Sequence, residues 1–292
     1  MLISNLLTNS VLIILMITYS NVHVTKMADF DANTMCFLFT GNKSVPSTQL
    51  QSVLLQTADE RPLLHGNILF VGDSIHELFA VSLRNLLLQG MKQSCSSRGN
   101  EYTCDDQVRV DFIRNDIVSL VTQEKITINT TDQRFEYPWI HLLNNTQIKY
   151  SLLVLNRGAH YDVDDILLAQ LNETLHYVKT NFPHIAIVWR NTPQGDHAWK
   201  LHYFSKPLTE PLVLAKNTLY FYDLFEAQNI VIRNWLKLHH HQVLYLDVAT
   251  SHNLRLDAHF DSIHSCIPGP IDEWSKMLYN AMKYIHTNSL EM

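Results

Sequence analysis

Glycine and positive charge are both scarce in this 292-residue sequence. Only 8 residues are glycine, about 3% against a usual share of about 7%, which excludes Gly-rich linkers, collagen-like repeats and a multi-glycine phosphate loop. Lys and Arg total 22 against 28 for Asp and Glu, so the net charge is −6 with histidine neutral. Because phosphate binding needs a basic surface, nucleic acid is not expected as a partner.

Long apolar runs are absent as well. The apolar segment 11–19 is well under the ~20 residues that span a bilayer, and its length is typical of the apolar core of a signal peptide. We interpret residues 1–25 as a secretory signal peptide or N-terminal anchor, with a buried strand as the alternative. The expected location is the secretory pathway, either the Golgi lumen or outside the cell, with membrane contact only through this segment.

Cysteine is scarce, and its spacing argues against common metal centres. None of the four cysteines forms a C-x-x-C pair, so we expect neither a zinc ribbon nor a thioredoxin-type site. Cys95 and Cys104 flank a polar stretch and are predicted to form a local disulfide, which leaves Cys36 to pair with Cys266; other pairings and free thiols are alternatives. Four Asn-x-Ser/Thr sequons support the same compartment: Asn42, Asn129, Asn144 and Asn172.

Short β-rich apolar runs alternate with helical patterns from residue 67 onward. This alternation indicates an α/β fold, a three-layer α/β/α sandwich around a mostly parallel sheet. Residues 26–64 are interpreted as a segment packed on one catalytic domain at 65–292, and the polar region 116–148 as an insertion. The expected strands are 67–71, 108–113, 151–155, 184–189 and 243–248, and the expected helices are 75–88, 163–179, 224–239 and 271–285.

The first expected strand ends in the sequence F-V-G-D-S-I, which places Ser74 at the start of a helix. In such folds, ligands bind where strands end and loops lead into helices. The Ser74 hydroxyl is therefore expected over the strand ends, and its backbone N–H, at the positive end of the helix, is suited to stabilising an oxyanion. The alternative is that Ser74 only caps the helix.

A second candidate feature is the pair Asp261 and His264, which lie three residues apart near the C-terminus. On one turn, the carboxylate can bond one imidazole nitrogen and orient the other to take a proton from serine. A surface pair is the alternative, since D-x-x-H is common by chance. The nearby Asp257 and His259 have a similar spacing but lack the Cys-x-Pro-Gly context, and we interpret them as a decoy.

These two blocks resemble those of the PC-esterase and trichome-birefringence-like family, within the SGNH/GDSL hydrolase superfamily. F-V-G-D-S-I is similar to the GDS block, and residues 261–274 are similar to D-x-x-H-W-C-L-P-G-x-P-D-x-W, with Ser265 and Ile271 as departures. The resemblance runs from about residue 65 to the C-terminus, and the family's cysteine-rich N-terminal portion is reduced to Cys36. Looser matches are N-R-G-A-H at 156–160 to N-T-G-H-W, W-R-N-T-P at 189–193 to F-R-T-x-S-P, and R-L-D at 255–257 to R-x-D.

The resemblance implies an SGNH-like, flavodoxin-like fold and an acyl-ester reaction, usually acetyl transfer to, or removal from, a glycan hydroxyl. It makes Ser74 the nucleophile, His264 the general base and acid, and Asp261 the residue that orients His264. Further candidates for oxyanion or substrate binding are Gly72, Asp73, Asn156, Gly158, His160 and Arg190.

The same resemblance limits the expected ligands. No metal and no cofactor are expected, and an acetyl donor such as acetyl-CoA would be a substrate. The expected partner is a glycan or a small acyl ester. A lipid or small-ester hydrolase on the same serine is one alternative, and a non-catalytic glycan-binding or surface protein with this fold is another.

Overall fold

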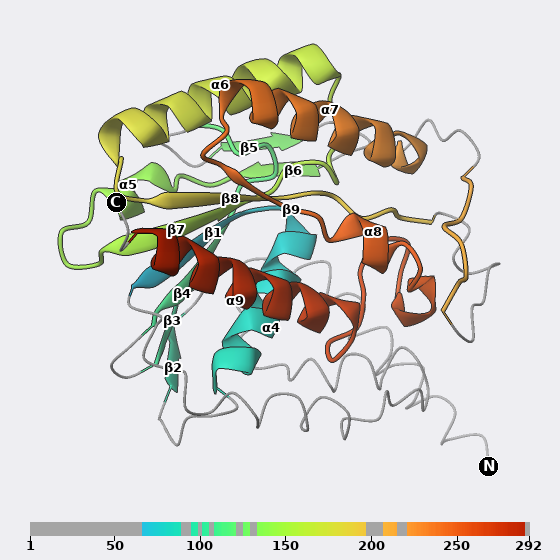
Figure 1. Cartoon of the computed structure of the whole chain (residues 1–292), viewed down its shortest axis with the longest axis horizontal. Coiled ribbons are helices and arrows are strands. Elements are labelled where there is room, and N and C mark those ends of the chain that lie inside the picture. Colours follow the sequence, from blue (N-terminus) through green and yellow to red (C-terminus); the bar gives the residue numbers. More distant parts are fainter. Residues whose placement is uncertain are drawn as a thin grey trace.

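A five-stranded parallel sheet forms the centre of the molecule (Figure 1). Its order is β4-β1-β7-β8-β9. The first strand in the chain, β1, thus lies between the next two strands of this sheet, β4 and β7, which is the flavodoxin-like arrangement. The strands are β1 (Asn67–Gly72), β4 (Val110–Arg114), β7 (Tyr150–Leu155), β8 (Ala186–Arg190) and β9 (Leu244–Leu246). The computed structural model describes residues 66–88, 95–98, 101–104, 108–120, 125–128, 133–196, 207–214 and 221–289.

Helices cover both faces of this sheet (Figure 1). Along β1, Ile68 and Phe70 point to one face and Leu69 and Val71 to the other, because successive side chains of a strand alternate. Both faces are buried, which explains the continuous apolar runs, and the predicted α/β/α sandwich is confirmed. Helices α4 (Ser74–Leu88) and α9 (Pro270–Ser289) pack together on the first face, and α6 (Asp164–Asn181) and α7 (Phe225–His239) cover the second.

Two antiparallel hairpins were not expected from the sequence. Strands β2 (Cys95–Arg98) and β3 (Glu101–Cys104) form the first, and β5 (Lys125–Ile128) and β6 (Gln133–Glu136) form the second, inside the predicted insertion. These strands are four residues long and mostly polar, so they carry no apolar run that signals a strand. Smaller elements are α5 (Ile140–Leu143), α8 (Ala249–His252) and 3-10 turns at Tyr222–Leu224 and Leu256–Ala258.

Several predictions concern residues that the structure does not describe. The signal peptide or anchor at 1–25, the segment 26–64, Cys36 and the sequons Asn42 and Asn129 all lie outside the described residues. In the described part of the chain, no helix is long and apolar enough to cross a membrane. The register of the first hairpin sets position 95 directly opposite position 104, and a disulfide there stays a prediction.

The carboxyl ends of the strands form the edge that carries the polar loops. The chain crosses from one side of β1 to the other between β4 and β7, so the loops after β1 and β7 meet at a topological switch point. A Cβ atom at Gly72 would lie 2.9 Å from the backbone oxygen of Asn156, so glycine permits this close approach.

Candidate active site

Ser74, His264 and Asp261 form a continuous chain of hydrogen bonds at this edge. The Oγ atom of Ser74, the first residue of α4, lies 2.7 Å from Nε2 of His264. On the other side of the ring, Nδ1 of His264 lies 2.7 Å from Oδ2 of Asp261. The second carboxylate oxygen, Oδ1, accepts the backbone N–H groups of Ile263 and His264 at 2.8 and 2.7 Å, which fixes the carboxylate on its turn.

The surroundings of Asp261 keep its carboxylate ionised. Burial favours the neutral form of Asp261. The pKa of Asp261 is nevertheless lowered, by the hydrogen bond to His264, by the charge of His264 and by the two backbone N–H groups. An ionised acceptor at Nδ1 holds the proton of the neutral imidazole on that nitrogen, so Nε2 presents its lone pair to the Ser74 hydroxyl. This arrangement is able to remove the hydroxyl proton from Ser74.

The N-cap of α4 is Asp73, and the alternative of Ser74 as the cap is excluded. Oδ1 of Asp73 accepts the backbone N–H groups of Ile75 and His76, both at 3.0 Å. The Ser74 hydroxyl is therefore available to His264. As the first helical residue, Ser74 also has no acceptor within the helix for its own backbone N–H, which lies at the positive end of the helix dipole.

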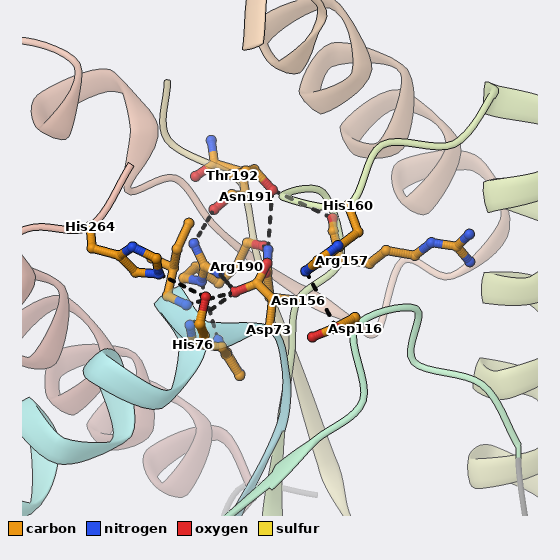
Figure 2. Close-up of polar contacts among 12 residues, drawn as sticks. Asp73, His76, Asp116, Asn156, Arg157, His160, Arg190, Asn191, Thr192 and His264 are labelled. Carbon is orange, nitrogen blue, oxygen red and sulfur yellow. Dashed lines mark hydrogen bonds and ion pairs between the residues drawn. The ribbon is translucent and has the colours of Figure 1, made fainter. Parts of the chain in front are cut away.

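Asp73 and Arg190, two of the predicted oxyanion- or substrate-binding residues, lie close together in the interior of the protein, where burial argues against direct contact with a substrate (Figure 2). Both side chains are 0% exposed, and Nη2 of Arg190 lies 3.6 Å from Oδ1 of Asp73 in a buried ion pair. Burial favours neutral Asp73, but the charge of Arg190 leads the groups that lower its pKa. Burial lowers the pKa of Arg190 to about 10, so both groups are charged near neutral pH.

Asn156 and Gly158 are also buried, and the Asn156 amide is not placed as an oxyanion donor. Its Nδ2 atom donates to the backbone oxygen of Arg190 at 3.0 Å and to Oγ1 of Thr192 at 3.2 Å, which uses both amide protons. A Cβ atom at Gly158 would lie 1.9 Å from Thr192 Oγ1, so this glycine serves the packing of the loops after β7 and β8. The backbone N–H of Ser74 lies beside the Ser74 hydroxyl at the start of α4, and a contribution of Gly158 to an oxyanion site stays a prediction.

His160 lies on the loop after β7, to one side of the buried ion pair (Figure 2). Its Nε2 atom is 3.4 Å from Oδ2 of Asp116, which follows β4, and 14% of its side chain is exposed. His160 therefore lies partly exposed between the loops after β4 and β7. Its role in substrate binding stays a prediction.

The segment after β8 supports the loop that carries Asp261 and His264, a contact that the sequence did not reveal. The Asp196 backbone N–H donates to the backbone oxygen of Ser262 at 2.6 Å, and the Tyr222 hydroxyl lies 3.0 Å from Ser262 Oγ. A Cβ atom at Gly195 would lie 2.8 Å from the Tyr222 ring and 2.9 Å from the Ser262 oxygen. The signal in the sequence for this contact is a glycine two residues after the W-R-N-T-P segment at 189–193.

Asp257 and His259 are held by other partners than each other, in agreement with the interpretation of this pair as a decoy. Asp257 pairs with Arg255 at 3.0 Å, while His259 Nε2 lies 3.2 Å from Nε2 of His252. The described residues contain no group of three or more His, Cys, Asp or Glu side chains placed to hold a metal ion.

Comparison with known proteins found no matching family model and no matching curated protein. Among solved structures, the periplasmic domain of a lipopolysaccharide acetyltransferase from Salmonella ser. Paratyphi A is 13% identical, over 84% of this chain and 98% of that one, with a TM-score of 0.46. A family two carbohydrate esterase from Clostridium thermocellum is 12% identical, over 76% and 64%, with a TM-score of 0.41. A peptidoglycan O-acetylesterase is 12% identical, over 80% and 95%, also at 0.41.

None of these likenesses is strong enough to assign an activity to this chain. The similarity to the PC-esterase and trichome-birefringence-like family likewise remains a resemblance of motifs, since no family model matches.

Proposed function

We propose that this chain is a serine-dependent acyl-ester enzyme of the SGNH type that works through an acyl-serine intermediate. The observation that carries the proposal is the hydrogen-bonded chain from Ser74 through His264 to Asp261, with both links at 2.7 Å. A serine, a histidine and a carboxylate in this order form the arrangement that activates a hydroxyl for attack on an acyl group.

The geometry supports a two-step reaction. His264 Nε2 takes the Ser74 proton as Oγ attacks the acyl carbonyl carbon, and the backbone N–H of Ser74 stabilises the resulting oxyanion. The tetrahedral intermediate expels the alcohol oxygen, which receives the proton from His264, and an acyl-serine remains. Water or an acceptor hydroxyl then loses its proton to His264 and attacks the acyl carbon. Ser74 Oγ leaves and is reprotonated by His264.

We further propose that the acyl group is acetyl and that the acceptor or substrate is a glycan hydroxyl. This finer assignment is supported by the two motif blocks around Ser74 and His264. The signal-like start and the sequons support a location in the secretory pathway, in the Golgi lumen or outside the cell. An acetyl ester or a thioester such as acetyl-CoA would supply the acetyl group as a substrate.

Active-site labelling tests the proposal directly. The full chain would be incubated with a fluorophosphonate probe, and the modified peptide identified by mass spectrometry. We expect the probe on Ser74 and no labelling of Ser74→Ala, while the exposed-site control Ser251→Ala is labelled like the wild type. A wild-type chain that the probe does not modify, or a Ser74→Ala variant that it still modifies at the same rate, would overturn the proposal.

A second assay separates transfer from hydrolysis. The chain that the probe modifies would be incubated with an acetyl donor, with and without a panel of glycans. The masses of the products would be measured by mass spectrometry. Acetylated glycan indicates a transferase, and free acetate from acetylated glycan indicates an esterase. Turnover of neither, with small esters still cleaved, contradicts the glycan assignment and leaves the acyl-serine chemistry standing.

A further inference from the structure

A cluster of buried polar side chains contacts the first turn of α4, which carries the proposed nucleophile, and the proposed reaction gives it no step. It consists of Asp73, His76 and Arg190, each of them 0% exposed. Two of these residues flank Ser74 in sequence, and Arg190 comes from the end of β8, more than a hundred positions later. Burying charged groups is costly, so their contacts point to a specific task.

We propose that Arg190 is a positioning residue that holds the first turn of α4, and with it Ser74, in register with His264. The inference rests on the proposed function, because it assigns Arg190 the task of holding Ser74 as a nucleophile. Arg190 acts through other groups and does not reach the substrate.

Arg190 faces the carboxylate oxygen that caps α4. Nη2 of Arg190 lies 3.6 Å from Oδ1 of Asp73, and this same Oδ1 accepts both backbone N–H groups that begin α4. The orientation of the Asp73 carboxylate therefore depends on two constraints, the helix N-terminus on one side and the guanidinium on the other. Ser74 lies between the cap residue and the N–H groups that it binds.

Arg190 also binds His76, in the first turn of α4. Nε of Arg190 donates to Nδ1 of His76 at 3.2 Å, and Nε2 of His76 donates to the backbone oxygen of Val154 in β7 at 3.0 Å. Burial, with the positive charge of Arg190, lowers the pKa of His76 to about 3, so the ring is neutral and this tautomer is the one that both bonds require. Arg190 and His76 thus tie the first turn of α4 to β7 and β8.

Arg190 contacts the C-terminal block as well. Its guanidinium carbon lies 5.2 Å from the centre of the Trp274 ring, which is buried in α9 just after the segment that carries His264. Nη1 donates to the backbone oxygen of Asn191 at 3.0 Å, which anchors the guanidinium to its own loop. One side chain therefore contacts the support of the nucleophile and the helix that follows the base.

Replacing Arg190 would change the protonation of Asp73, an effect that a loss of packing would not have. The groups that act on the Asp73 charge are Arg190 from β8, His76 from α4 and His160 from the loop after β7. Without the guanidinium, burial would raise the pKa of Asp73, since His76 is neutral. A protonated Asp73 is a weaker acceptor for the N–H groups of α4.

The test compares Arg190→Met with Arg109→Met in the full chain. Arg109 lies at the opposite, amino end of β4, where its Nε binds Asp111 at 2.5 Å, and the Asp111 side chain is 2% exposed. Both variants remove one arginine from a buried carboxylate, so Arg109→Met is a matched control for lost stability. For each chain, kcat/KM for a small chromogenic acetyl ester would be measured from pH 5 to 9, with the melting temperature.

We expect Arg190→Met to lower kcat/KM by about 10²-fold, mainly through kcat, because small misplacements of reacting groups have effects of that size. The acid limb of its kcat/KM against pH should shift to higher pH, and adding Asp73→Asn to Arg190→Met should abolish that shift. Arg190→Lys should recover part of the lost kcat/KM. Arg109→Met should lower the melting temperature and keep the wild-type pH profile. Equal kcat/KM losses and unchanged pH profiles in both variants would overturn the positioning role.

A spectroscopic measurement separates failure of this inference from failure of the proposed function. The ¹⁵N shift of His264 Nε2 reports its hydrogen bond to Ser74 whether or not the chain turns over an ester. A chain that neither hydrolyses esters nor binds the probe contradicts the proposed function. In that same chain, a His264 shift altered by Arg190→Met and not by Arg109→Met supports positioning, and a shift unaltered by Arg190→Met refutes it.

Discussion

The hydroxyl group of Ser82 in α4 donates a hydrogen bond of 2.6 Å to Oδ1 of Asp272 in α9. Oδ2 of the same carboxylate accepts the backbone N–H of Gly269 at 2.6 Å, and this bond caps the start of α9. The sequence separation of 190 residues equals that between Ser74 and His264. The two sequence blocks are therefore joined twice, once at the site and once in the core two turns along α4.

This bond predicts a loss of stability for Ser82→Ala. The substitution leaves Oδ1 of Asp272 buried without the hydroxyl that bonds it, which should cost about 1–3 kcal/mol of unfolding free energy. Urea denaturation measures the change, and Asn85→Ala on the exposed side of the same helix is the control, expected to stay within about 0.5 kcal/mol. An equal effect of the two variants would show that the Ser82 bond contributes nothing specific.

The role of Asp261 is tested by replacing each of two nearby carboxylates. Asp261→Asn should lower kcat for a small acetyl ester by about 10⁴-fold, because an amide no longer selects the tautomer of His264 that accepts the Ser74 proton. Asp257→Asn should stay within about twofold, since Asp257 pairs with Arg255 and not with His264. Steady-state kinetics at pH 8 measures both. If Asp257→Asn proves the more damaging variant, the assignment of the carboxylate is wrong.

Two buried histidines predict that acid weakens the fold. Burial lowers the pKa of His259 to about 4, and burial together with His259 lowers that of His252 well below its ordinary value of 6.5. Between about pH 4 and 6.5 the unfolded chain therefore binds protons that the folded chain does not, so stability rises with pH in this window and falls as pH drops. Each histidine contributes at most about 1.4 kcal/mol per pH unit.

Urea denaturation at pH 7.0, 5.5 and 4.5 measures this dependence. His259→Asn removes one of the histidines whose pKa is lowered by burial, a set that also includes His76 and His240, and should reduce the slope of unfolding free energy against pH by that residue's share. The control is His184→Asn, at an exposed position, which should leave the slope unchanged. A slope that His259→Asn does not reduce would mean that the buried pair is not responsible for the acid sensitivity.

The sequence predicted the sheet and the contact between Asp261 and His264 because both leave strong local signals. A strand buried on both faces reads as an unbroken apolar run, as in 68–71 and 152–155, and the alternation of such runs with helical patterns predicted the fold class. The spacing of Asp261 and His264 likewise predicted their contact, which the structure contains at 2.7 Å. These features depend on neighbours within a few residues.

The placement of the polar side chains around the site was not predictable in the same way. Asp73 and Arg190 are polar and follow strands, and the sequence alone does not distinguish a side chain that faces a cleft from one buried beneath it. Their ion pair joins the residue that follows β1 to the last residue of β8. The Asn156 amide donates both of its protons to the end of β8 and to the loop that follows it. Such contacts depend on how distant loops pack at the edge of the sheet, which no local pattern records.

Glycosylation should distinguish the two sequons that the structure describes. Asn144 and Thr146 are both exposed in the turn after α5, whereas Asn172 lies within α6 and accepts a hydrogen bond of 3.1 Å from His240 Nε2. The hydroxyl of Thr174, the last residue of that second sequon, is buried and donates to the Val118 oxygen at 2.8 Å. Asn172 is exposed like Asn144, but its place in a helix, its bond to His240 and the buried Thr174 hydroxyl oppose modification, so we expect a glycan at Asn144 in chains made in a secretory host.

Site-specific mass spectrometry of the secreted chain measures this occupancy. Asn144→Gln should remove one glycan and leave the melting temperature unchanged, since the side chain lies in solvent. Asn172→Gln should leave the glycan mass unchanged and lower the stability slightly, because it disturbs the bond to His240 that packs α6 against the end of α7. Full occupancy at Asn172 would contradict this order, since a glycan on that amide would compete with His240 for the same side chain.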